Sequence, residues 1–78
     1  MNKKKYLIRA FSKENRIIYM GVINLGLNSE GVPTHIMDID VLKWIKEFAG
    51  EHRHNLRDLS IEEFLDVMGY DNIEISTL

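Results

Sequence analysis

The sequence is 78 residues long, 45% apolar and 28% charged, with no cysteine, one proline and a formal net charge of −2. A chain of this length encloses one hydrophobic core, so we expect a single α+β domain over residues 1–78. The lack of cysteine excludes disulfides, thiolate metal ligands and thiol nucleophiles, and it favours a soluble, cytoplasmic protein because small secreted domains usually need such cross-links.

The first half of the chain has the apolar pattern of β-strands. Residues 5–11 alternate between two faces, and the polar residues 12–15 predict a turn into a second strand at residues 16–25. This second strand is apolar on both faces, whereas a strand in a two-layer domain normally turns one face to water. Its apolar residues are Ile17, Tyr19, Ile23 and Leu25 at odd positions and Ile18, Met20 and Val22 at even positions.

Residues 26–33 are rich in turn-forming types and predict a second hairpin, followed by a short third strand at residues 34–39. From Asp40 the spacing becomes helical and predicts a helix that ends near Ala49, with Asp38 or Asp40 as N-cap and Gly50 just past its end. The apolar stripe of this helix is Val41, Trp44, Ile45 and Phe48. We expect residues 51–59 to form a connecting loop or a frayed turn.

A second helix is predicted from a capping box, in which Ser60 and Glu63 exchange hydrogen bonds between side chain and backbone. The helix should end at Gly69, and residues 73–76 then alternate as a short edge strand. Its buried stripe is Ile61, Phe64, Leu65 and Met68.

The elements predict a two-layer α+β domain in the order β-β-β-α-α-β. We expect an antiparallel sheet of three or four strands with both helices on one face. The predicted core places Tyr6, Ile8, Ile17, Tyr19 and Ile23 against Trp44, Phe48, Phe64 and Met68.

Two helices cover only one face of the sheet, so the other face is predicted to expose Leu7, Phe11, Ile18, Met20 and Val22. An exposed apolar patch of this kind usually marks an interface with another protein or with a second copy of the chain. The alternatives are a strongly bent sheet, or residues 26–33 folded across this face.

These observations favour a non-enzymatic protein-interaction module, a small inhibitor or regulator that docks on a larger macromolecular complex. In size, in layout and in its lack of a catalytic motif, the chain is similar to small inhibitor proteins carried by phages and mobile elements, including anti-defence proteins. This is a likeness of scale alone.

The alternative function is a nucleic-acid-binding regulator. Residues 1–33 hold six basic and two acidic residues, a net charge of +4, whereas residues 34–78 hold four basic and ten acidic residues, a net charge of −6. The basic amino-terminal hairpin carries interleaved aromatic residues that suit a phosphate backbone, although a pI of about 5.9 is far from the usual signature. Its basic residues are Lys3, Lys4, Lys5, Arg9, Lys13 and Arg16. The acidic half is interpreted as a solvated helix face, with docking on a basic protein surface as the alternative.

We expect no catalytic site, cofactor, metal ion or small-molecule substrate. His52 and His54, with Glu51, Asp58 and the distant His35, offer metal-ligand types, but the spacing is not diagnostic and a solvated loop explains it. No serine lies in a nucleophile elbow, and no glycine pattern is typical of phosphate binding. No apolar run approaches the length of a membrane span, so we expect no membrane association.

Overall fold

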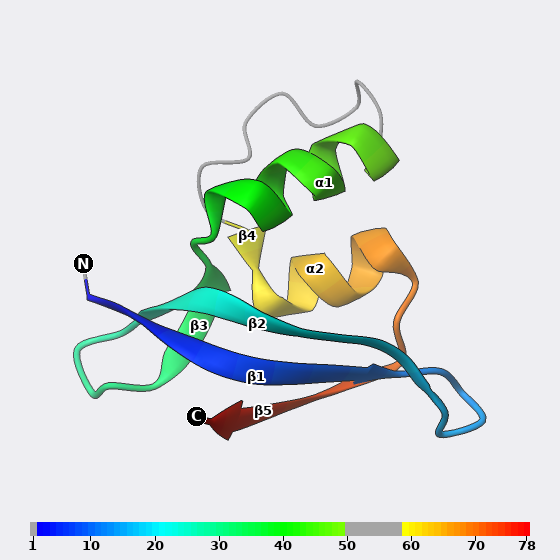
Figure 1. Cartoon of the computed structure of the whole chain (residues 1–78), viewed down its shortest axis with the longest axis horizontal. Coiled ribbons are helices and arrows are strands. Elements are labelled where there is room, and N and C mark those ends of the chain that lie inside the picture. The colour runs from blue at the N-terminus through cyan, green and yellow to red at the C-terminus, as the bar shows by residue number, and fades with distance from the viewer. Residues whose placement is uncertain (1, 50–58) are drawn as a thin grey trace.

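The computed structural model describes residues 2–49 and 59–78. Figure 1 shows both helices on the same side of one antiparallel sheet, so the predicted α+β class and its two layers are confirmed. Over these described residues the sheet has five strands in the order β4-β3-β2-β1-β5, more than the three or four expected. The elements are β1 (Lys3–Phe11), β2 (Ile17–Leu27), β3 (Pro33–Ile36), α1 (Ile39–Ala49), β4 (Leu59–Ser60), α2 (Ile61–Met68) and β5 (Asn72–Thr77).

Strand β1 lies between β2 and β5 and is antiparallel to both. Its even-numbered residues face the helices, and Ile8, which is fully buried, lies opposite Gly21 of β2 and Ile75 of β5. The odd-numbered residues of β1 therefore lie on the opposite face, because side chains alternate along a strand. We call this the outer face.

Strand β3 is short, and it pairs only with the last three residues of β2, from Leu25 to Leu27. Strand β4 continues the sheet through the pair formed by Leu59 and Ile36. The expectation of a loop over residues 51–59 is wrong at Leu59, which is 2% exposed, and the rest of that range lies outside the described residues. A two-residue strand has no periodicity of its own, so only its long-range pairing identifies it.

The helix starts follow the sequence closely. Before α1, the Asp38 Oδ1 atom accepts a hydrogen bond from the Val41 amide at 3.3 Å, which is the predicted N-cap contact. Before α2, the Glu63 amide donates to Ser60 Oγ at 3.1 Å and the Ser60 amide donates to Glu63 Oε1 at 3.4 Å, so the capping box is confirmed. Gly69 ends α2 with φ 73°. Gly50 lies outside the described residues.

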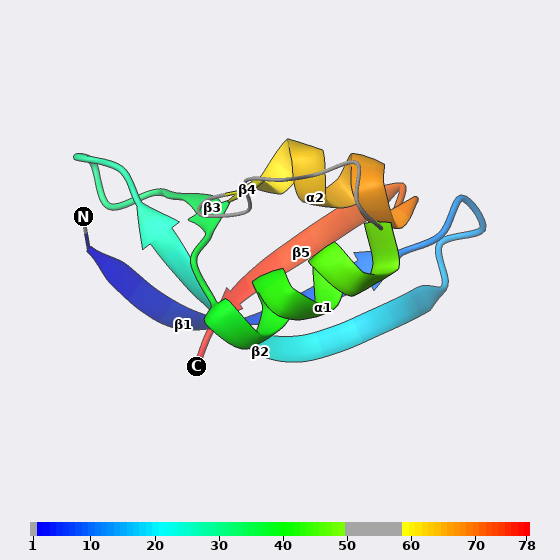
Figure 2. The same ribbon diagram turned by 90° about the horizontal axis from the view of Figure 1, so that it is seen from above.

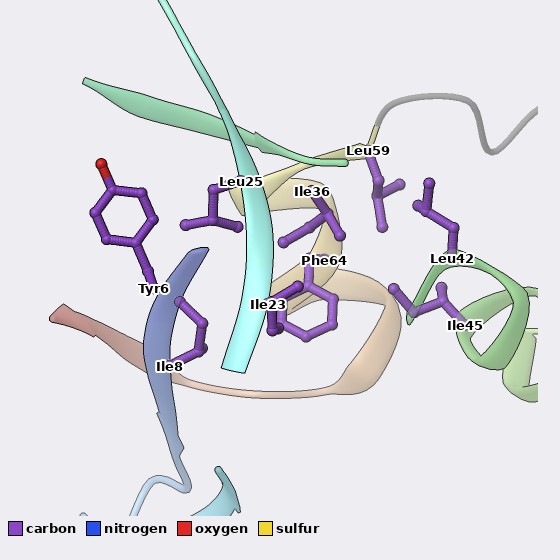
Figure 3. Close-up of a cluster of buried hydrophobic side chains, with 9 residues drawn as sticks. All are labelled: Tyr6, Ile8, Ile23, Leu25, Ile36, Leu42, Ile45, Leu59 and Phe64. Atoms are coloured by element: carbon purple, nitrogen blue, oxygen red, sulfur yellow. The ribbon is translucent and has the colours of Figure 1, made fainter. Parts of the chain in front are cut away.

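The core lies between the sheet and the two helices, as the close-up in Figure 3 shows. Within it, Leu42 and Ile45 point from α1 toward the cluster, and Phe64 does so from α2. The prediction that Trp44 and Phe48 are buried is wrong, because they are 38% and 60% exposed. The largest fully buried side chains are Ile8, Ile23, Leu25, Ile36, Ile45, Leu59 and Phe64.

The helix α1 is therefore rotated relative to the prediction. Two overlapping stripes of this helix are apolar, one through Trp44 and Phe48 and one through Leu42 and Ile45. The second stripe faces inward because β4 and α2 supply Leu59 and Phe64 as apolar partners there. The sequence alone does not show that β4 exists, so it does not separate the two stripes.

The predicted burial of Ile17 is also wrong, since this side chain is 53% exposed. The pairing of β1 with β2 shifts at this point, because Ala10 lies opposite Tyr19 while the next residue, Phe11, lies opposite Ile17. Residue 18 is thus an extra residue in β2, a β-bulge that reverses the alternation of faces. The bulge moves Ile17 to the outer face, beside Phe11.

An aromatic group fills the space between the first half of β2 and the helices. The ring of Tyr19 stacks on Trp44 at a centroid distance of 5.4 Å and on Tyr70 at 6.0 Å, and it meets the edge of Phe64 at 6.3 Å. Gly21 makes room for this ring, since a Cβ atom built there would lie 2.8 Å from the Tyr19 hydroxyl. Burial, followed by the charge of Asp38, raises the pKa of Tyr19. The hydroxyl therefore stays neutral at physiological pH.

Candidate interaction surface

The five residues predicted for the exposed sheet face lie on the outer face or at its bulge. On β2, Ile18, Met20 and Val22 are 49%, 60% and 51% exposed. On β1, Leu7 and Phe11 are half-buried because neighbouring strands flank them on both sides. The bulge adds Ile17, which sequence reasoning assigned to the core. We call this group the outer patch: Leu7, Phe11, Ile17, Ile18, Met20 and Val22.

The outer patch is graded from apolar to polar across the sheet. Leu7 lies between Val22 of β2 and Ser76 of β5, and Arg9 lies between Met20 and Glu74. The Arg9 Nη1 atom lies 3.4 Å from Glu74 Oε1, and this pair is solvent-exposed. The apolar side chains therefore concentrate on β2, while the β5 side carries polar and charged groups.

The turn between β2 and β3 leaves the exposed residues of β2 uncovered. It is closed on itself, because the Asn28 Oδ1 atom accepts hydrogen bonds at 2.9 Å from the amides of Glu30 and Val32. Gly31 has φ 79°, which a side chain would disfavour. The alternative in which residues 26–33 fold across the outer face does not hold for Met20 and Val22, because both side chains are more than half exposed.

A feature that sequence reasoning missed is an open edge on the first half of β2. The Asn24 amide faces away from β1, where it donates to Asp38 Oδ2 at 3.1 Å, and the Asn24 carbonyl accepts from the Met37 amide. Backbone groups alternate in direction along an antiparallel strand, so those of Met20 and Val22 face the same way. No described strand pairs with them there, and Figure 2 shows β2 as the rim of the sheet on the α1 side.

Asp38 closes this open edge at one end. Its Oδ2 atom accepts from both the backbone and the side chain of Asn24 at 3.1 Å, while Oδ1 caps α1. Burial opposes ionisation of this carboxyl group, but the hydrogen bonds from Asn24, Val41 and Asp40 together outweigh it and lower the pKa of Asp38. The carboxylate is therefore ionised at neutral pH, and it places a negative charge beside β2.

A hollow of about 430 Å³ lies between this end of β2 and the start of α1. It is lined by apolar, acidic and basic side chains, among them Lys3, Lys5, Val22, Asn24, Asp38 and Asp40. The outer patch therefore runs at Val22 into a charged rim, which is the usual arrangement of an interface.

The six basic residues of the nucleic-acid alternative do not form one group. Lys3 and Lys5 lie at the start of β1, Lys4 places its Nζ atom 5.7 Å from the centre of the Tyr6 ring, and Arg9 bridges to Glu74. Lys13 and Arg16 lie in or beside the turn at the far end of the hairpin. The strand β1 separates the two ends by nine residues, about 30 Å of extended chain.

Other predicted sites are only partly placed. His52, His54, Glu51 and Asp58 lie outside the described residues, and the His35 Nδ1 atom is 2.9 Å from the Thr34 hydroxyl. Over residues 2–49 and 59–78, no group of three or more His, Cys, Asp or Glu residues is arranged to hold a metal ion. None of the helices in that part of the chain has the length and apolar character needed to cross a membrane.

Comparisons with protein families, with curated proteins and with solved structures find no match to this chain. The fold and the outer patch are therefore the basis on which a function can be proposed.

Proposed function

We propose that the chain is a non-enzymatic protein-interaction module, a small inhibitor or regulator that docks on a larger macromolecular complex through the outer patch. The observation that carries the proposal is the exposure of three large apolar side chains, Ile18, Met20 and Val22, within one strand on the helix-free face. Such a patch binds by releasing water from apolar surface, and the charged rim around it sets orientation.

The layout favours a partner that is a protein. The centre of the patch is apolar, with the exposed ion pair of Arg9 and Glu74 at its border, and the other basic side chains of the hairpin lie at its two ends. A nucleic-acid partner would need a continuous positive track. Proteins of phage or mobile-element origin that block a host complex are one class with this size and this mode of action, and the lack of cysteine suits the cytoplasm.

The experiment compares two valine variants. Val22→Asp places a charge on the outer patch, and Val32→Asp places the same charge in the β2–β3 turn, where the side chain is 48% exposed against 51% for Val22. The two forms and the wild type, each checked for a folded circular dichroism spectrum, are cross-linked in an extract of the source cells and analysed by mass spectrometry.

We expect the wild type and Val32→Asp to retain the same protein, and folded Val22→Asp to lose at least about 90% of it. A loss of that size corresponds to about 1.4 kcal/mol or more of binding free energy. The Leu7→Asp variant should lose the same protein, because Leu7 lies beside Val22 on the same face. Equal retention by all four forms would contradict the proposal.

A further inference from the structure

Along the open edge of β2, no strand of the described residues pairs with the backbone, and exposed apolar side chains lie beside it. The backbone of Met20 and Val22 faces this edge, and both side chains are more than half exposed on the outer face. On the other face, Trp44 stacks on Tyr19 and remains 38% exposed. Natural sheets commonly protect such an edge with charge, proline, a β-bulge or a covering element. Residues 17–23 contain no charged residue and no proline, and the bulge at Ile18 lies at one end of this stretch, away from Met20 and Val22.

The opposite edge of the sheet, β5, differs in these respects. Its outer side chains are polar, with Glu74 at its centre, while Ile73 and Ile75 pack inward against the core. Within the described residues, both strands present backbone groups that no neighbouring strand pairs with, and of the two strands β2 is the one that combines them with a long apolar run. Of these two edges, the edge of β2 therefore gains more from pairing with another strand.

The charges at the two ends of the open edge are complementary. Arg16, which is exposed, lies just before β2 at one end, and the Asp38 carboxylate, held by Asn24, lies at the other. If two copies of this edge pair in antiparallel fashion, each Arg16 comes next to Asp38 of the other copy. The lysines near that end, Lys3 and Lys5, belong to β1 and so lie one strand further from the edge.

We propose that the chain forms a two-fold symmetric dimer by antiparallel pairing of β2 with β2 of a second copy, which joins the two sheets edge to edge. The free stretch between the hairpin turn and Asn24 is residues 17–23, and its midpoint is Met20. The dimer axis therefore passes at Met20, and Val22 lies near Ile18 of the second copy. An isologous contact of this kind closes after two copies.

Edge pairing leaves the outer face free and doubles it. Side chains stand roughly perpendicular to a sheet, so the outer patches of the two copies become one apolar strip that crosses the dimer axis. The inference rests on the proposed function in one respect: the dimer presents two equal docking surfaces and fits a partner with two-fold symmetry or with a repeated surface.

The register gives a test with single cysteines, because the natural chain contains none. With Met20 opposite Met20, a hydrogen-bonded pair, the two Cα atoms lie about 5.5 Å apart, within the range of a disulfide. The Met20→Cys variant should form a covalent dimer under mild oxidation. In the same register Val22 lies opposite Ile18 of the second copy, so the two Val22 residues are four residues apart, about 13 Å along the strands. Val22→Cys should therefore stay mostly uncross-linked.

Light scattering over a concentration series measures the mass of the unmodified chain. We expect twice the mass of one chain, a monomer for Arg16→Glu, and recovery of the dimer when Arg16→Glu is mixed with Asp40→Arg. Asp40 is the exposed acid beside Asp38 that also lines the hollow. The Leu7→Asp variant, one strand away from the edge, should keep the dimer mass.

Two results would overturn the inference. A monomer at every concentration would mean that the edge does not pair with itself and is left for a strand of another protein. Equal cross-linking of Met20→Cys and Val22→Cys would mean random collision. If the wild type is monomeric while Leu7→Asp and Val22→Asp still lose the retained protein, the dimer is wrong and the proposed function stands. If the wild type is a dimer and neither variant loses that protein, the dimer stands and the proposed function is wrong.

Discussion

The two halves of β2 are both largely apolar but have different surroundings. In the second half, Ile23 and Leu25 are fully buried. Strand β1 pairs with one side of the backbone there, and β3 or the Asp38 carboxylate bonds to the other side. In the first half, β1 is the one strand among the described residues that pairs with β2, and Met20 is 60% exposed. The difference shows that the reach of the neighbouring strand, rather than composition, decides whether an apolar strand becomes core or surface.

The boundary between the two halves of β2 has a structural cause. Strand β3 is four residues long and the chain then turns into α1, so pairing beyond Asn24 stops at the Asp38 cap. The capping contact that starts the helix therefore also ends the ladder. One carboxylate thus sets both the direction of α1 and the length of the open edge.

The largest expected effect is a difference in the free energy of unfolding between substitutions in the two halves of β2. Leu25→Ala removes a fully buried side chain and should lower the free energy of unfolding by about 2–5 kcal/mol, through lost burial and a residual cavity. Met20→Ala, on the exposed half, should change it by less than about 0.5 kcal/mol. Urea unfolding in dilute solution measures both. Comparable losses would mean that Met20 is also part of the core.

A smaller effect on stability is expected at Asp38, which lies at the boundary between the two halves of β2. Asp38→Ala removes the N-cap of α1 and the acceptor for Asn24, and should cost about 1 kcal/mol near neutral pH. The folded-state pKa of Asp38 lies below its unfolded value of about 3.8, so its carboxylate contributes stability that is fully present above that value. This contribution is lost as the pH falls through the lower, folded-state pKa.

The difference in stability between wild type and Asp38→Ala should therefore shrink in acid, as followed by thermal unfolding between pH 7 and pH 2, roughly the span over which carboxyl groups titrate. Asp40→Ala is the matched control, because it removes the neighbouring carboxylate and leaves the Asn24 and Val41 hydrogen bonds in place. A pH-independent difference for Asp38→Ala would show that its effect comes from the cap geometry alone.

Local signals in the sequence predicted most of the fold. The capping box of Ser60 and Glu63 spans four consecutive residues, and the alternation predicted for β1 spans seven. Both can therefore be recognised in the sequence without tertiary contacts. What failed depends on contacts distant in sequence. The bulge that exposes Ile17 is a property of two paired strands, and the inward face of α1 depends on Leu59, which joins the sheet through β3.

The candidate surface was predicted in part for the same reason. The double apolar character of β2 is visible in the sequence, and counting helices was enough to predict that Met20 and Val22 are exposed, as they are. The open edge was not predicted, because an edge exists only once the length and position of β3 are known. A short β3 and a predicted six-residue one look alike in sequence, yet they leave different lengths of β2 unpaired.

The smallest expected effect concerns the polar border of the exposed half, where Arg9 faces Met20 on one side and Glu74 on the other. The side chains of Arg9 and Glu74 are 36% and 56% exposed, so solvent screens the pair and its coupling free energy should be at the low end of about 0.2–1 kcal/mol. A double-mutant cycle with Arg9→Gln and Glu74→Gln measures it, and added salt should reduce it further. A coupling well above 1 kcal/mol would mean that Arg9 is committed to β5. A weak one leaves the guanidinium free to exchange Glu74 for an acidic group of a docking partner, which gives the apolar half of β2 a charged contact at little cost in stability.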